Sequence, residues 1–386
     1  MRTPSRALCV VFLAVWLSGP LFSADIRVPR LEMMSRAFLD EDVFRLTTRV
    51  DLEMALEGGY KFGADVGFRF QNQRIEEPTE LTGPPYTDEE AERINALFNN
   101  TLRFQYARAT TREVFGAPLD LVYFTGAIDR FASGREFERR FATRPFASEY
   151  AGFRYFPDGV QYDGIHAVRG TGLQLRGPVG SDRWSADLYL YQDEQIRPGV
   201  FSSDGRVLFN HPQIKIETFV GATFPEAALG VYRGGMLLFL DSGVGGEFLA
   251  QVGLPYWAPN GSGDDLSLDD FFIMIEPRVR LESFGIFLTL FWHPAFYEQR
   301  PTGEEGSLDL NMKLLLGNPF TGGAYGGIDH TIQFTPEGDE QVELSLSPFL
   351  RVATSGVLWD MTLRAKVYPF DLTDALQAFF GIRTEF

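Results

Sequence analysis

From Val357 to Tyr368, apolar and polar side chains alternate with a period of two. One set consists of Val357, Trp359, Met361, Leu363, Ala365 and Val367, and the other of Leu358, Asp360, Thr362, Arg364, Lys366 and Tyr368. Successive side chains of a β-strand point to opposite faces, so the stretch predicts a strand with one apolar and one polar face. The final stretch, Leu376 to Phe386, repeats the alternation.

Two stretches near the front of the chain, Val43 to Met54 and Tyr60 to Gln71, alternate in the same way. Gly58 and Gly59 separate them, and such a pair joined by a glycine turn predicts a β-hairpin. Their polar positions hold many charges. A charge is costly on the buried face of a soluble core, whereas a water-filled interior accommodates it. The pattern therefore predicts strands that separate a wet lumen from an apolar surrounding.

Further stretches with strand character lie between these ends, at about 101–109, 119–130, 165–176, 184–194, 213–222, 228–240, 244–254, 271–282, 285–293, 307–316, 324–334 and 341–352. Turn residues join many of them, as at 177–182, 241–243, 283–285 and 354–356. The predicted fold is all-β. It is a transmembrane, antiparallel, up-and-down β-barrel formed by residues 24–386, with about sixteen strands and an error of two.

Loop lengths provide a check on that count. Barrels of this class place short turns on one side and long loops on the other. Counting back from Phe386, the long segments 72–100 and 131–164 fall on the short-turn side. We therefore expect one missing strand at 199–210, and a second within Ile26 to Leu39 to keep the number even.

The N-terminal stretch has the features of a secretory signal peptide. Arg2 and Arg6 precede an apolar segment from Ala7 to Leu17, which is followed by small residues and a proline. That segment is too short to span a membrane as a helix, although a single anchoring helix is the alternative. We predict that residues 1–23 are removed on export.

Composition excludes several classes of protein. The single cysteine, Cys9, lies within the predicted signal peptide, so the mature chain has no disulfide and no thiolate metal site. A formal net charge of −17 lacks the basic footprint of nucleic-acid binding. Aromatic residues make up 14% of the chain, which suits the two aromatic girdles of a membrane barrel.

The chain ends on Phe386 within an alternating strand. In this it resembles the C-terminal strand of bacterial outer-membrane β-barrel proteins, porins among them, in which the last residue is typically Phe. Thr384 departs from the bulky apolar residue that the family favours near this end. The resemblance covers residues 24–386 as architecture. It implies location in the bacterial outer membrane, contact with outer-membrane lipid, and recognition of the Phe386 strand by the barrel assembly machinery.

Few residues suggest catalysis or metal binding. The four histidines lack metal-site spacing, and Asp329-His330 is the only adjacent Asp–His candidate. Neighbouring strand residues point to opposite faces, so we do not expect this pair to act together. We predict no enzyme activity, no cofactor and no metal.

Two other local patterns have simpler interpretations than ligand binding. Gly170-Thr171-Gly172 lacks the third glycine of a nucleotide loop and indicates a narrow place in a strand. The acidic cluster in the 255–270 loop could hold Ca²⁺, but a solvated loop is favoured. Its members are Asp264, Asp265, Asp269 and Asp270.

Charged residues on the predicted polar faces are the candidates for lining a pore. The main set is Arg45, Arg49, Asp51, Lys61, Asp65, Arg69, Arg278, Arg280, Asp360, Arg364, Lys366 and Arg383. Asp187, Glu217, Glu276, Asp309 and Arg351 also fall on polar faces. Opposed basic and acidic rows select polar over apolar solutes. The alternative is a lumen closed by cross-strand ion pairs.

Among the long loops 72–100, 131–164 and 255–270, the second is rich in arginine and phenylalanine. We hypothesise that it folds into the barrel as a constriction. Its candidate residues are Arg135, Arg139, Arg140 and Arg144.

These features predict a porin-like channel for passive diffusion of small hydrophilic solutes. Two alternatives remain open. One is a plugged transporter for hydrophobic substrates, which the phenylalanines of the 131–164 loop suggest. The other is a structural or adhesive barrel without transport.

Overall fold

The computed structural model describes residues 25–40, 43–58, 61–72, 102–150, 164–194, 200–224, 230–259, 266–294, 305–318, 323–335, 341–370 and 375–385. These residues contain eighteen β-strands. They are β1 (Asp25–Asp40), β2 (Val43–Gly58), β3 (Phe62–Asn72), β4 (Leu102–Thr111), β5 (Asp120–Phe131), β6 (His166–Val179), β7 (Ser181–Asp193), β8 (Val200–Asn210), β9 (Ile214–Phe224), β10 (Val231–Asp241), β11 (Gly246–Trp257), β12 (Phe272–Arg280), β13 (Phe284–His293), β14 (Ser307–Leu316), β15 (Gly323–Phe334), β16 (Val342–Thr354), β17 (Val357–Tyr368) and β18 (Leu376–Glu385). The described helical elements are η1 (Val114–Gly116), α3 (Gly134–Phe141) and η2 (Leu268–Asp270). No helix in this part of the chain is both long enough and apolar enough to cross a membrane.

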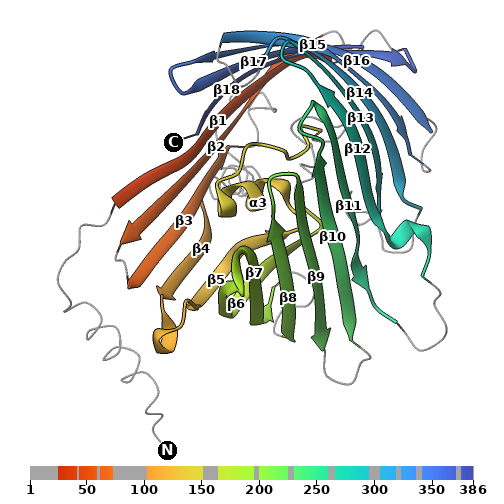
Figure 1. Ribbon diagram of the computed structural model, residues 1–386. Coiled ribbons are helices and arrows are strands. Elements are labelled where there is room, and N and C mark those ends of the chain that lie inside the picture. The colour runs from red at the N-terminus through yellow and green to blue at the C-terminus, as the bar shows by residue number, and fades with distance from the viewer. Residues whose placement is uncertain are drawn as a thin grey trace, which may run out of the picture.

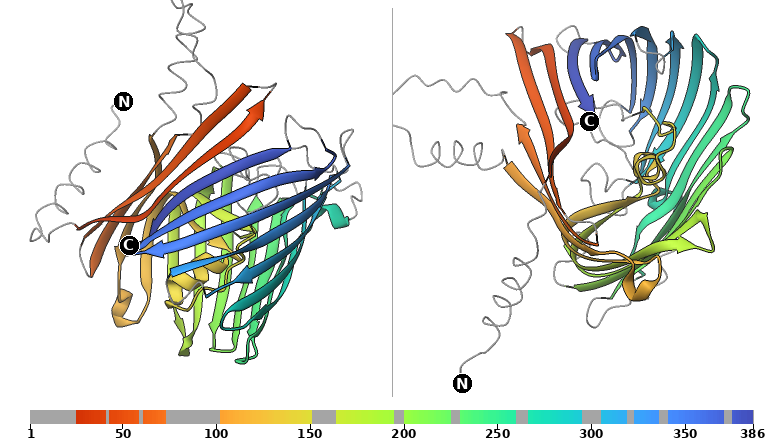
Figure 2. Two further views of the ribbon diagram at one scale, coloured as in Figure 1. Left: turned by 90° about the horizontal axis from the view of Figure 1, so that it is seen from above. Right: turned by 60° about the vertical axis from the view of Figure 1, so that its left-hand side comes forward.

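The strands form one closed sheet. Each strand pairs antiparallel with the next along the chain, and β18 returns to β1. The closing pair runs from Arg30 opposite Glu385 to Phe38 opposite Gln377. Figures 1 and 2 show the resulting ring of tilted strands. The predicted all-β, antiparallel, up-and-down barrel is thus confirmed.

The strand count of eighteen lies at the upper end of the predicted range. The two strands missing from the initial sixteen are β1 and β8. β8 lies where loop parity predicts a missing strand, and β1 lies where an even total requires a second one. Their alternation is weak for identifiable reasons. Ser203 and Gly205 occupy outward positions of β8, while β1 carries Met33 beside Met34.

With β8 included, the long connections all fall on one rim. The short-turn rim joins strands through segments such as 211–213, 242–245 and 281–283. The opposite rim, here called the long-connection rim, receives both 72–100 and 131–164 together with 255–270. The parity conflict in the sixteen-strand count therefore arose from the missed β8.

The outward side chains of the wall are apolar and exposed. Leu188 and Leu190 on β7 are 55% and 56% exposed, and Val220 on β9 is 70% exposed. Such a belt around a whole protein is unfavourable in water and suits the hydrocarbon interior of a membrane.

Aromatic side chains lie on the outside near both rims. Toward the short-turn rim, the rings of Trp184 and Phe209 pack 4.5 Å apart. Toward the long-connection rim, Tyr232 packs on Phe224 and Trp257, with ring centroids 6.2 Å and 5.8 Å apart. A closed barrel with an apolar belt between aromatic girdles is the architecture of an outer-membrane β-barrel. The chain is accordingly placed in the bacterial outer membrane, as its sequence predicts.

Candidate functional site

The described part of the 131–164 connection, residues 132–150, lies inside the barrel and is called the insertion here. It contains α3, which sits within the ring of strands in Figures 1 and 2. Ser133 caps the helix by accepting a hydrogen bond from the Glu136 backbone N–H at 3.2 Å. Ala142 ends it in a left-handed conformation, which turns the chain back along the inner wall.

Aromatic side chains attach the insertion to the wall. Phe137 packs on Phe141 and Phe146, with ring centroids 4.8 Å and 5.6 Å apart. Phe146 in turn lies 4.7 Å from the ring of Phe239 on β10. These rings belong to a buried cluster that extends from β5 to β13. Burying each ring contributes on the order of 2 kcal/mol, so the insertion forms a true core with one side of the barrel.

Arginines of the insertion form ion pairs with inward residues of that wall. Arg140 donates to both carboxylate oxygens of Asp187 at 2.6 Å and 2.8 Å, a bidentate pair. Arg144 pairs with Asp241 and, at 3.1 Å, with Glu247. Two candidate constriction residues therefore bind the inner wall directly.

Uncharged groups of the insertion reach further around the ring. The Ser148 hydroxyl donates to Glu276 at 2.6 Å, and the Tyr150 hydroxyl donates to Asp309 at 2.6 Å. These two bonds extend the polar contacts of the insertion around the wall to β12 and β14, although it leaves the wall at β5.

Glu149 lies between two cations of the wall. Its Oε2 is 2.6 Å from Lys313 Nζ on β14 and 2.9 Å from Arg351 Nη1 on β16. The surrounding protein desolvates the carboxyl, which opposes ionisation, but Lys313 and Arg351 hold the pKa of Glu149 well below its ordinary value. This group of three is called the Glu149 clamp.

The wall beside the insertion contains fully buried charges. Arg206 on β8 pairs with Asp187 and lies 3.4 Å from Asp129 and 3.6 Å from Glu217. Nearer the long-connection rim, Arg233 bonds Asp204 at 2.7 Å, and neither side chain is exposed. We call the inner wall of β5–β14, together with the insertion, the packed half of the lumen.

Inward charges on the other side of the ring remain partly exposed. Arg364 pairs with Glu343 at 3.1 Å, with 13% and 26% of the side chains exposed. Arg108 pairs with Asp65 at 2.9 Å, with 23% and 21% exposed. Asp360, which pairs with Arg351, is 19% exposed. The described inward side chains of β16–β18, β1, β3 and β4 are called the wet half.

The predicted pore-lining residues divide between these environments. Asp65, Asp360 and Arg364 line the wet half, and Lys366 and Arg383 occupy inward register positions of β17 and β18 there. Lys61 is exposed at the turn before β3. The side chains of Arg45, Arg49, Asp51 and Arg69 lie outside the described part of the structure, as do Phe386, the predicted signal peptide and residues 73–100 of the predicted 72–100 loop.

Arg278 is placed differently from its predicted role, because it is buried beneath the insertion. It donates to the Phe146 carbonyl and to Glu276, both at 2.5 Å. Its neighbour Arg280 lies 3.9 Å from Glu247. Alternation identifies an inward side chain but carries no information about what covers it.

The other two arginines of the insertion, Arg135 and Arg139, lie on α3. Arg139 is 71% exposed at the side chain and pairs with Glu136 at 3.3 Å. Arg135 is partly buried on the first turn of α3. Of the four candidate constriction residues, Arg140 and Arg144 thus form ion pairs with the wall, and Arg139 forms one within α3.

Several residues of the site escaped the sequence analysis. Lys313 continues the alternation that includes Asp309 and Asn311, so the period of two is sufficient to predict that it faces the lumen. Arg206 lies on the missed β8. Glu149 lies in a segment with no periodicity, and only its position inside the barrel reveals its partners.

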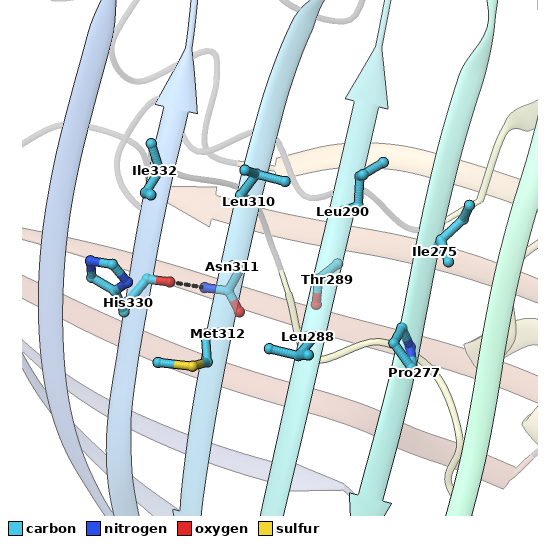
Figure 3. A pocket seen from close by; sticks show the side chains of 10 residues that line it. All are labelled: Ile275, Pro277, Leu288, Thr289, Leu290, Leu310, Asn311, Met312, His330 and Ile332. Atoms are coloured by element: carbon cyan, nitrogen blue, oxygen red, sulfur yellow. Dashed lines mark hydrogen bonds between the residues drawn. The ribbon is translucent and has the colours of Figure 1, made fainter.

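The Asp329-His330 dipeptide points to both faces of the wall. Asp329 accepts a hydrogen bond from Asn311 inside the barrel. His330 faces outward in a shallow groove of about 370 Å³, lined also by Leu310, Met312 and Ile332 (Figure 3). No cluster of potential metal ligands occurs among the described residues.

The remaining local patterns have structural explanations. A Cβ added to Gly172 would lie 2.4 Å from Cβ of Tyr191, so the glycine leaves room for this inward tyrosine. Asp269 and Asp270 hydrogen-bond with Ser267 at the start of η2. Asp264 and Asp265 lie outside the described residues.

No protein-family model and no curated protein matches the chain. Among solved structures, it is similar to a mutant of the Rh. blastica porin, with a TM-score of 0.43 and 9% identity over 94% of this chain and 100% of that one. It is also similar to Wzi of Escherichia coli, described as a carbohydrate-binding β-barrel, with a TM-score of 0.49 and 10% identity over 100% and 89% of the two chains. For OpdK of Pseudomonas aeruginosa with vanillate, the TM-score is 0.48 and the identity 8%, over 94% and 98%. At these scores, nothing about function follows from the likeness.

Proposed function

We propose that the barrel is a channel through which small hydrophilic solutes diffuse passively along the wet half of the lumen. The observation that carries the proposal is the contrast in burial between the two sets of inward charges. Those of the packed half are buried among wall side chains and the insertion, whereas those of the wet half keep contact with solvent. An eighteen-stranded ring is also wider than side chains can fill.

The charges of the wet half suit polar solutes. Arg351, Asp360, Arg364 and Glu343 stand on adjacent strands and present both signs to the lumen. Mixed charges along a wet wall stabilise a polar solute and give no binding surface to an apolar one.

The alternative of a carrier for hydrophobic substrates has less support. It requires the aromatic side chains of the insertion to line an entry site. Phe137, Phe146 and Phe239 are instead at most 1% exposed and pack against one another. They stabilise the insertion against the wall.

Planar-bilayer recording tests the proposal. The purified barrel is expected to conduct ions with a stable single-channel current, and replacement of α3 by a short glycine-serine linker should increase that current because it uncovers the packed half. Liposomes containing the barrel should swell in small sugars. A barrel that neither conducts nor admits sugars would overturn the channel function and favour a structural or adhesive role.

A second variant guards against misfolding of the deletion. Arg144→Ala removes the contacts with Asp241 and Glu247 but keeps the aromatic packing. We expect more frequent current fluctuations as the insertion moves. An unchanged current in both folded variants would show that the insertion does not border the path.

A further inference from the structure

We propose that Lys313 and Arg351 form a binding site for the carboxylate of a permeating solute, and that Glu149 is an occupant supplied by the chain itself. The inference rests on the channel function proposed above and specifies its solute class: small organic anions that carry a carboxylate. Binding of such a solute would displace Glu149 and remove the ion pairs that join the insertion to β14 and β16.

The geometry is that of a carboxylate held by two donors. Lys313 Nζ and Arg351 Nη1 approach the same oxygen of Glu149 at 2.6 Å and 2.9 Å. The two cations come from β14 and β16, which are separated by β15 in the sheet. Charge-assisted hydrogen bonds of this kind are about twice as strong as neutral ones.

Residues other than Glu149 hold the two cations in place. Lys313 Nζ lies 4.9 Å from the centroid of the Phe349 ring, and the Arg351 guanidinium lies 5.3 Å from it. Asp360 Oδ2 is 2.6 Å from Arg351 Nε. Phe349 itself packs in a separate buried cluster of β13–β16. The cationic site is therefore built into the wall, whether or not Glu149 occupies it.

Glu149 is also the member of the clamp that solvent reaches most easily. Its side chain is 35% exposed, compared with 7% for Lys313 and 14% for Arg351. The clamp lies at the border between the packed and wet halves, so a solute in the wet half can approach it. Leaving a buried ammonium unpaired is costly, and an incoming carboxylate restores the pairing that Lys313 loses.

Calorimetric titration of the full barrel in detergent micelles tests the proposal with benzoate as the probe and benzamide as its neutral counterpart. Glu149→Ala should bind benzoate about tenfold more tightly than the unmodified chain, because a tethered competitor acts at millimolar effective concentration. Lys313→Met should lose benzoate binding, and benzamide should bind none of the variants. Arg176→Gln, which removes a cation paired with Asp120 at 3.2 Å outside the clamp, should leave benzoate binding unchanged.

The possible outcomes separate this inference from the channel function. Benzoate binding that is no tighter in folded Glu149→Ala than in the unmodified chain, or absent from both, would overturn the carboxylate site. Because calorimetry does not require conduction, a barrel that binds benzoate as expected but carries no current would overturn only the channel. Glu149→Ala keeps the contacts that hold Lys313 and Arg351 against Phe349 and Asp360, so the test does not depend on folding of Lys313→Met.

Discussion

The two halves of the lumen use the same kinds of charged residue but hold them in different surroundings. In the packed half, Arg206 and Arg233 pair with aspartates that have no exposed side-chain surface. In the wet half, Arg108 and Arg364 pair with carboxylates that are more than one fifth exposed. The difference comes from the side chains packed over these pairs, those of the insertion and of the aromatic core among them, because the strands of both halves follow the same alternation. Similar ion pairs should therefore contribute differently to stability and to ion selectivity in the packed and wet halves.

The largest expected difference concerns stability. Arg206→Ala leaves buried Glu217 without the cation beside it and leaves Asp187 with Arg140 alone, which should reduce the free energy of unfolding by about 3–5 kcal/mol. Arg364→Ala removes a partly solvated pair and should cost no more than about 1 kcal/mol. Urea unfolding in detergent micelles measures both. Equal costs would contradict the division into a packed and a wet half.

Ion selectivity should be more sensitive to a charge change in the wet half than to one in the packed half. Arg364→Glu reverses a charge that faces the wet half, and a unit charge at about 4 Å in water is worth ~1 kcal/mol. The ratio of cation to anion permeability should rise several-fold, as read from the reversal potential in a salt gradient. Asp193→Asn, whose carboxylate is buried beside Ser202 in the packed half, serves as the matched control and should leave the ratio unchanged.

The smallest expected effect is the pH response of the Glu149 clamp, which joins the two halves. When folding lowers the pKa of a carboxyl, its ion pairs stabilise the folded state fully at pH values above the ordinary pKa. This stabilisation is lost only as the pH falls through the lowered pKa. The clamp should therefore hold between about pH 7 and pH 5, where an ordinary glutamate is also mostly ionised. Trypsin cleavage after Arg140, which requires release of the insertion because Asp187 holds that guanidinium, should be equally slow at both ends of that window after correction for trypsin activity. Faster cleavage in the unmodified chain at the lower pH would show that Glu149 is not held ionised, and Glu149→Gln should be cleaved faster at both values.

Much of the fold follows from period two alone. The stretch from Val357 to Tyr368 is a strand as predicted, and the parity of loop lengths correctly predicts β8. The number of strands was harder to predict. On β8, the small residues Ser203 and Gly205 remove the contrast in polarity between the two faces. The barrel class was nevertheless predicted correctly, since closure requires only that the first and last strands can pair.

The candidate site could be predicted only in part. Alternation identifies Asp360 and Arg364 as inward, and it identifies Arg278 in the same way. Whether such a residue meets water or the insertion depends on a segment whose own sequence has no periodicity. Glu149 shows this limit most clearly, since its two partners lie 164 and 202 residues further along the chain.

By itself, the sequence determined the two-faced wall: which side chains face lipid, which face the lumen, and that a ring of strands must close around a polar interior. These properties are local, because each depends on the residue type at every second position and on the cost of a charge in an apolar medium. Only the tertiary structure decided which inward charges are covered. That outcome depends on the path of one insertion through the barrel and on contacts between residues far apart in the chain, which no local pattern encodes.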